Sequence, residues 1–376
     1  MPPKTNVDLS KMAPEEWVEN LRTKHGYDDE PEIGFEIFGT TDEKTEWLQQ
    51  ERCRLERLAK RATEQAVTAS RVDSIRKVMR QEELARMGDV FFGMFPTYSV
   101  NAYAGFTPRG DRVVMLHSAL PATISAWAKF FLAKVEANSE TDRTEHLPTD
   151  NDLLLLCYSI GSAWVPEFKP LIPFSGHFTP KTISPVSEDS RSLARVLSES
   201  ALAFVIGHEI GHILEGHVGY HPTDKTFNHN MEFAADSWGL RLCLRHALRA
   251  GVTSDDTFVT KFAMLGPHLA MGTIATIRNV QTGHHPSVDR RFERVQNGVE
   301  AELESHLGNR AFHEVLEVLD EDWLLRLRSI GQKLYHQHIE LGNLIESFRA
   351  VIRHTGAQPA AQKVPELRTL LTTDPR

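Results

Sequence analysis

Residues 204–217 read Phe-Val-Ile-Gly-His-Glu-Ile-Gly-His-Ile-Leu-Glu-Gly-His, and this stretch decides the fold. Its apolar residues predict a buried helix. His208 and His212 are four residues apart, so a helix stacks them one turn apart, where both can bind one metal ion. Glu209 borders the same patch and can reach a metal-bound water. Burying two histidines and a glutamate without a partner is costly, and a metal ion relieves that cost. This is the zincin arrangement, in which zinc activates water and the glutamate acts as general base.

A catalytic zinc site needs three protein ligands and an open fourth position, so a third ligand must come from elsewhere. The metzincin pattern would place a glycine at 215 and a histidine at 218. The chain has Glu215 and Val218 there, which excludes that subclass. His217 and His221 lie nearby, but His217 would point away from the metal face if the helix continued through it.

Glu232 is the better candidate for the third ligand. It lies in Met-Glu-Phe-Ala-Ala-Asp (residues 231–236), at the start of a second predicted helix over about 230–248. Asp236 is four residues further on, shares its face, and can orient a ligand histidine. Gly239 on the same stripe would let the two helices pack closely. The sequence therefore predicts a zinc site made by His208, His212 and Glu232.

Four separated motifs resemble the HtpX-like and CAAX-prenyl-endopeptidase type of gluzincin metallopeptidases. They follow in the family's order and span about residues 98–295. They are residues 101–104 (Asn-Ala-Tyr-Ala) with the strand-like 112–116, residues 207–217, residues 232–236 with Gly239 and Leu240, and residues 285–292 (His-Pro-Ser-Val-Asp-Arg-Arg-Phe).

The resemblance implies roles for individual residues. His208, His212 and Glu232 would hold Zn²⁺, with Glu209 as base and proton shuttle and Asp236 supporting a ligand histidine. His285 and Arg291 would face the cleft, where either could stabilise an oxyanion. The strand over 112–117 would be the active-site edge strand, pairing with an extended substrate.

Composition narrows the class of protein. The chain has 376 residues, 41% hydrophobic and 25% charged, which suits a globular protein with a substantial core. The net charge of −9 offers no basic footprint for nucleic acid. Three widely spaced cysteines argue against a disulfide framework, and no secretory signal or membrane span is apparent. We therefore predict a cytoplasmic protein, and the metallopeptidase resemblance implies protein or peptide substrates.

The chain divides into four predicted regions. They are a loosely ordered arm over 1–42, a helical region over 43–90, a metallopeptidase domain over 91–300 with an insertion at 121–187, and a C-terminal helical region and tail over 301–376. Five prolines make residues 165–185 an irregular loop, which we predict to be a lid over the cleft.

The expected fold is α+β: a predominantly helical zincin (gluzincin) fold with a small edge-strand sheet. The expected activity is that of a zinc metalloendopeptidase. One alternative is a regulatory or stress-response protein of the same fold that cleaves one dedicated partner or none. Another is a structural zinc domain, whose fourth coordination position would be closed.

Overall fold

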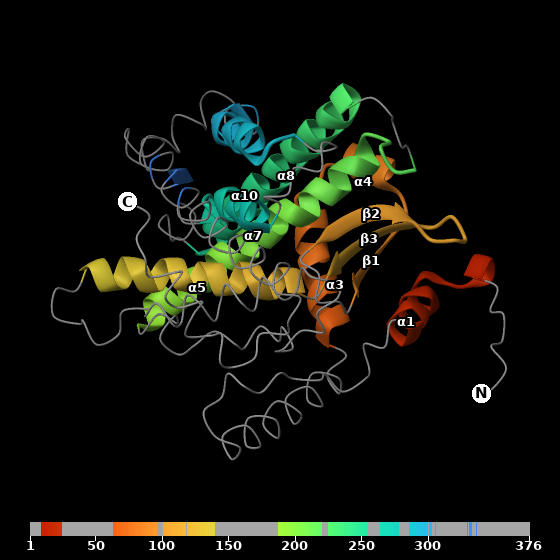
Figure 1. The fold of residues 1–376 in the computed structure, drawn as a ribbon, viewed down its shortest axis with the longest axis horizontal. Helices are drawn as coiled ribbons and strands as arrows, with labels where there is room; N and C mark the ends of the chain where they lie inside the picture. Colours follow the sequence, from red (N-terminus) through yellow and green to blue (C-terminus); the bar gives the residue numbers. More distant parts are fainter. Residues whose placement is uncertain are drawn as a thin grey trace, which may run out of the picture.

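The computed structural model describes most of the segments that surround the predicted site. These are residues 9–24, 63–95, 101–117, 119–139, 187–219, 225–254, 263–277 and 286–299, with positions 301, 302, 305, 329, 331, 332 and 336. A small sheet lies at one end of two long helices that run side by side, and further helices pack around that pair (Figure 1). The described part of the chain is therefore mostly helical with one small sheet, an α+β arrangement.

The elements follow one another along the chain as helices, then strands, then helices. They are η1 (Leu9–Lys11), α1 (Pro14–Lys24), α3 (Thr63–Arg76), α4 (Gln81–Met87), β1 (Val90–Phe95), β2 (Ala102–Phe106), β3 (Arg112–His117), α5 (Ala119–Ser139), α7 (Glu188–Leu214), α8 (Lys225–Ser254) and α10 (Gly266–Ile277). One more helix covers residues 288–299.

The N-terminal arm contains more structure than its sequence predicts. Helix α1 begins at Pro14, whose missing N–H is not needed in a first turn, and Glu15 and Glu16 lie at its positive end. The prediction of a loosely ordered arm is therefore wrong for residues 14–24. Helices α3 and α4 lie within the predicted helical region over 43–90, of which residues 43–62 lie outside the described part.

The sheet has the order β1-β3-β2, which corrects the prediction for residues 112–117. Strand β3 lies in the middle, parallel to β1 and antiparallel to β2. It cannot be an edge strand, because both of its sides are already hydrogen-bonded. Its residues 113–116 are buried, as expected for a central strand with both faces covered. Within the described sheet the two edges are β1 and β2.

Helix α7 is the central element of the core. Its N-cap is Ser187, whose hydroxyl oxygen accepts a hydrogen bond from the Ser190 N–H. Its second half is buried on all sides between α5, α8, α10 and the sheet (Figure 1). Most of its apolar residues belong to one continuous core, which also includes Trp127 and Phe292. Most of the polar residues in this half are therefore buried, and His212 is partly exposed.

Glycines bring α7 and α8 into backbone contact. A Cβ atom at Gly207 would lie 3.1 Å from the Cα of Gly239, and one at Gly211 would lie 3.0 Å from the Cα of Ala235. Neither helix could approach so closely with larger residues at these positions. The expected close packing at Gly239 is confirmed, and it holds side chains from the two helices at a fixed separation.

Three arginine contacts fasten the N-terminal helices to α7 and α8. Arg71 forms two hydrogen bonds of 2.7 Å with Glu199. Arg245 and Glu83 form an ion pair of 2.8 Å in which both side chains are 5% exposed, so the pair is fully inside the protein. Arg86 donates to the carbonyl of Leu214, the last residue of α7. The helical region before the sheet is thus part of the same core.

Several predictions concern segments outside the described residues. These are the proline-rich loop 165–185, most of the insertion at 121–187, and most of residues 301–376. The first part of the predicted insertion is helix α5, which packs on α7. In the described residues, no helix combines the length and apolar character needed to cross a bilayer.

Candidate metal centre

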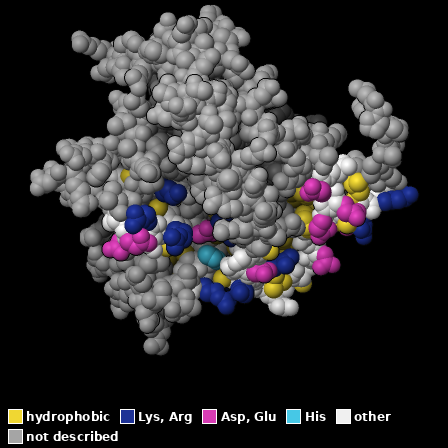
Figure 2. All heavy atoms as spheres, turned by 90° about the horizontal axis from the view of Figure 1, so that it is seen from below, with side chains coloured by type: hydrophobic (Ala, Val, Ile, Leu, Met, Phe, Trp, Pro, Cys, Tyr) yellow, Lys and Arg dark blue, Asp and Glu magenta, His cyan; other side chains and the backbone are white. Residues whose placement is uncertain are grey.

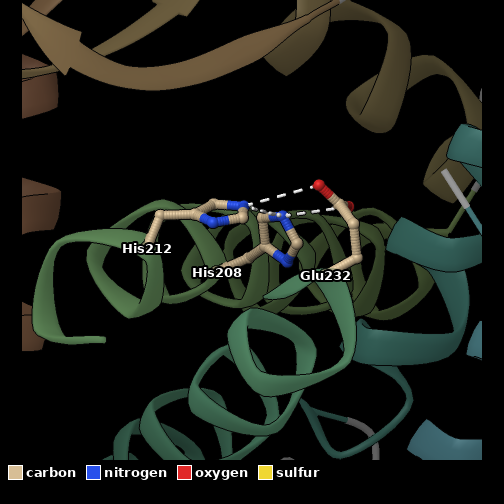
Figure 3. A group of neighbouring side chains, drawn as sticks. All are labelled: His208, His212 and Glu232. Atoms are coloured by element: carbon tan, nitrogen blue, oxygen red, sulfur yellow. Dashed lines mark hydrogen bonds and ion pairs between the residues drawn. The ribbon is translucent and has the colours of Figure 1, made fainter. Parts of the chain in front are cut away.

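The structure brings His208, His212 and Glu232 together. The two histidines project from α7 and the glutamate from α8, and all three side chains point to one side of the helix pair (Figure 3). One ligand atom of each lies within 4.8 Å of the others. The Nε2 atoms of the histidines are 3.2 Å apart. The carboxylate oxygens of Glu232 lie 3.8 Å from His208 Nε2 and 3.7 Å from His212 Nε2.

These three distances suit a zinc ion. Two ligand atoms on a tetrahedral zinc ion lie about 3.4 Å apart when each is about 2.1 Å from the metal. The two Nε2 atoms are 3.2 Å apart, and each lies 3.7–3.8 Å from a different oxygen of the Glu232 carboxylate, close to that value. Two imidazoles and one carboxylate also form a donor set that zinc prefers. In the described residues this is the one group of three potential ligands that lie so close together.

Asp236 and Arg291 form a buried ion pair directly behind His208. The Nδ1 atom of His208 lies 3.0 Å from Oδ1 of Asp236, so a proton on Nδ1 donates to that carboxylate. Arg291 donates to both Asp236 oxygens, from Nε at 2.8 Å and from Nη2 at 2.6 Å. Burial alone would raise the pKa of Asp236, but Arg291 and His208 lower it. The aspartate is therefore an anion that can fix the orientation of His208.

Arg291 also reaches the other acidic groups of the site. Its Nη1 atom lies 3.2 Å from a carboxylate oxygen of Glu232. Burial would lower the pKa of this guanidinium, but the charges of Asp236, Glu232 and Glu209 raise it. Its side chain is 2% exposed. Arg291 therefore lies buried against the carboxylates of both Asp236 and Glu232.

The two histidines of α7 differ in their electrostatic surroundings. Burial lowers the pKa of His212 to about 3, and a positive charge on His208 acts in the same direction. His212 is therefore neutral at pH 7 and has a lone pair to offer. Burial also acts to lower the pKa of His208, but the hydrogen bond and charge of Asp236 outweigh it and raise that pKa. Glu209, the expected base, is 7% exposed.

One predicted residue cannot be placed, and His217 contacts His212 on the ring nitrogen opposite the one that faces His208 and Glu232. His285 lies outside the described residues. His217, expected to point away, lies with its Nδ1 atom 3.1 Å from Nδ1 of His212. Figure 2 shows one face of the molecule, on which acidic and basic side chains lie close together among hydrophobic ones. The glycine at 216, a common helix-ending residue, was the signal in the sequence that the helix does not continue to His217.

Residues 166–311 match the family model Peptidase U49. The matched segment contains α7, α8 and the helix over 288–299, and with them every member of the cluster described above. Comparison with curated proteins and comparison with solved structures both find no match. This part of the chain is thus similar to a family of peptidases. The match does not point specifically to the HtpX-like and CAAX-prenyl-endopeptidase group that the sequence motifs resemble.

Proposed function

We propose that this chain is a zinc-dependent endopeptidase that hydrolyses peptide bonds in a protein or peptide substrate. The observation that carries the proposal is the convergence of His208, His212 and Glu232 from two helices, at separations that fit tetrahedral zinc. The similarity of residues 166–311 to a peptidase family supports it independently. The buried Asp236–Arg291 pair adds the kind of outer support that metal-binding histidines require.

Each residue of the site has a part in the proposed reaction. His208, His212 and Glu232 would hold zinc, which when bound polarises the scissile carbonyl and activates a water for attack. Glu209 takes a proton from the attacking water while the oxygen of that water forms a bond to the carbonyl carbon. The same carboxyl group then donates that proton to the leaving nitrogen as the C–N bond breaks. Asp236 and Arg291 keep His208 and Glu232 in place throughout.

We further propose that the substrate lies along β2. This strand forms one edge of the described sheet and contacts α7, whereas β3 is excluded because it is central. An extended peptide can add to an exposed sheet edge through main-chain hydrogen bonds. Amide hydrogen exchange in β2 should slow when a peptide substrate is added to the Glu209→Gln variant, and unchanged exchange there would contradict this placement.

Three variants test the proposed activity. Glu209→Gln should retain zinc but lose at least about 100-fold in peptide cleavage, because general-base catalysis is removed. His208→Ala should lose zinc and activity together. Glu199→Gln is the matched control, since Glu199 lies on the same helix but pairs with Arg71 away from the cluster, and it should keep both.

Zinc content by elemental analysis and cleavage by proteome-wide N-terminal profiling give the two readouts. A wild-type protein that binds no zinc, or a Glu209→Gln variant that cleaves as fast as wild type, would refute the proposal. New N-termini in many proteins would indicate a general endopeptidase. New N-termini in a single protein would instead favour the dedicated-partner alternative.

A further inference from the structure

The chain reverses direction immediately after α7 and folds His217 back onto the helix. Helix α7 ends at Leu214, and Gly216 has φ +70°, a left-handed conformation that glycine adopts at little cost. The His217 N–H then donates to the carbonyl of His212 at 2.8 Å. This reversal places the His217 ring 5.3 Å from the His212 ring, centroid to centroid.

A metal ion bound to His212 would decide which nitrogen of each ring carries the proton. The Nε2 atom of His212 faces His208 and Glu232, so its lone pair is the one available to a metal. A neutral imidazole that binds through Nε2 carries its proton on Nδ1. That Nδ1–H lies 3.1 Å from His217 Nδ1, which must then accept the hydrogen bond. With metal bound to His212, His217 would therefore be held in the form protonated on Nε2.

The turn that carries His217 is itself fixed on both sides. Arg86 of α4 donates to the Leu214 carbonyl at 2.6 Å and lies 3.7 Å from the Glu215 carboxylate. Trp238 of α8 donates its indole N–H to the same carboxylate at 2.7 Å. The His217 ring is therefore presented from an anchored position, and it can impose an orientation on its neighbour.

We propose that His217 is the positioning residue of His212: it selects the tautomer and fixes the ring orientation in which His212 offers Nε2 to the metal. This inference rests on the proposed zinc site. His208 has an anionic partner, Asp236, for the same purpose, whereas His212 depends on a neutral imidazole. Asp236 itself is held by Arg291, and His217 by the anchored turn, so each ligand histidine has its own separate support.

The experiment measures zinc affinity in the full chain by competition with a chromophoric chelator. His217→Ala should weaken zinc binding by about 10–100-fold, the usual effect of removing a partner of a metal ligand. His217→Asn should restore affinity to within a few-fold of wild type, because its side-chain oxygen can accept from His212 Nδ1–H. Val218→Ala, in the same turn, is the matched control and should bind zinc like wild type. The visible spectrum of the cobalt-substituted protein should change in His217→Ala and return in His217→Asn.

The outcomes separate this inference from the proposed function. If the wild-type protein binds no zinc, the proposed metal site fails. If wild type binds zinc and His217→Ala binds it within threefold of wild type, the positioning role is refuted while the metal site stands. Equal losses in His217→Ala, His217→Asn and Val218→Ala would also refute it, because they would show only that the turn needs its native packing.

Discussion

The buried pair Arg291–Asp236 makes the stability of the metal-free protein sensitive to one substitution, Arg291→Met. Methionine has a similar length but removes the charge and every donor of the guanidinium. The substitution would remove two hydrogen bonds to Asp236, of 2.8 Å and 2.6 Å, and the ion pair of 3.2 Å with Glu232. Arg291 and Asp236 are each about 2% exposed, so water cannot replace the lost hydrogen bonds. Breaking such a pair costs about 3–5 kcal/mol, which raises the unfolding constant by roughly 10²–10⁴.

Urea unfolding in the presence of a chelator measures this cost, since metal binding would otherwise stabilise the folded state. The control is Arg191→Met, which removes an ion pair whose side chains are 50% and 77% exposed. That exposed pair, three residues apart on a helix, should contribute about 0.5 kcal/mol or less.

A second substitution distinguishes a lost charge partner from a simple packing defect. Asp236→Asn in the Arg291→Met background removes the carboxylate that would otherwise be left without its counter-ion. The double variant should therefore be more stable than the sum of the two single losses implies. The reasoning is refuted if Arg291→Met costs less than about 1 kcal/mol, or if the two losses add within about 0.5 kcal/mol.

Three further predictions concern the core around the site. A Cβ at Gly211 would lie 2.7 Å from the Cβ of Trp238, so Gly211→Ala should reduce the free energy of unfolding by about 1–3 kcal/mol and weaken zinc binding. Gly298→Ala, which meets only the end of one leucine side chain, is the control and should change urea stability little. Burial raises the pKa of the Cys243 thiol to about 12, so iodoacetamide at pH 8 should modify this cysteine only after the protein unfolds. Peptide mass spectrometry measures the labelling, and equal labelling of the native and the unfolded protein would contradict this prediction. Burial lowers the pKa of His268 to about 4, below its value of about 6.5 in an unfolded chain. The free energy of unfolding therefore has its full value above pH 6.5 and decreases by up to about 3 kcal/mol as the pH falls toward 4, because the unfolded chain then binds the proton more readily. Urea unfolding of His268→Leu should show a smaller change in that free energy between pH 6.5 and pH 4 than wild type.

The grouping of the three candidate ligands could be predicted because helical periodicity places the pair on each helix and the gluzincin pattern indicates the second helix as the source of the third ligand. His208 and His212 are one turn apart, and Glu232 and Asp236 repeat that spacing on the next helix. The glycines that permit close packing also stand at regular positions on the two helices. Local spacing therefore specified both faces of the candidate site, and the observed distances follow from bringing those faces together.

The order of the strands could not be predicted from the same kind of pattern. Alternation of side chains tells which residues of a strand share a face, but not which strand lies beside it. The parallel strands β1 and β3 are separated by β2 in the sequence, so no hairpin turn in the sequence indicates that they pair. The buried pair Glu83–Arg245 could not be predicted for a related reason. Its partners are 162 residues apart in the sequence, and nothing in the local sequence distinguishes either residue from an ordinary surface charge.

The ion pairs that join α3 to α7 and α4 to α8 have a consequence for synthesis of the protein. Their partners on α7 and α8 follow 128 and 162 residues later in the chain. At translation rates of about 5–20 residues per second, this separation amounts to roughly 6–30 s on the ribosome. During that time the strands and α5 exist without the helix that completes their core, and their apolar faces are open to chaperones or to aggregation. The proposed metal centre includes Glu232 of α8, so it could be completed only after that helix has been synthesised.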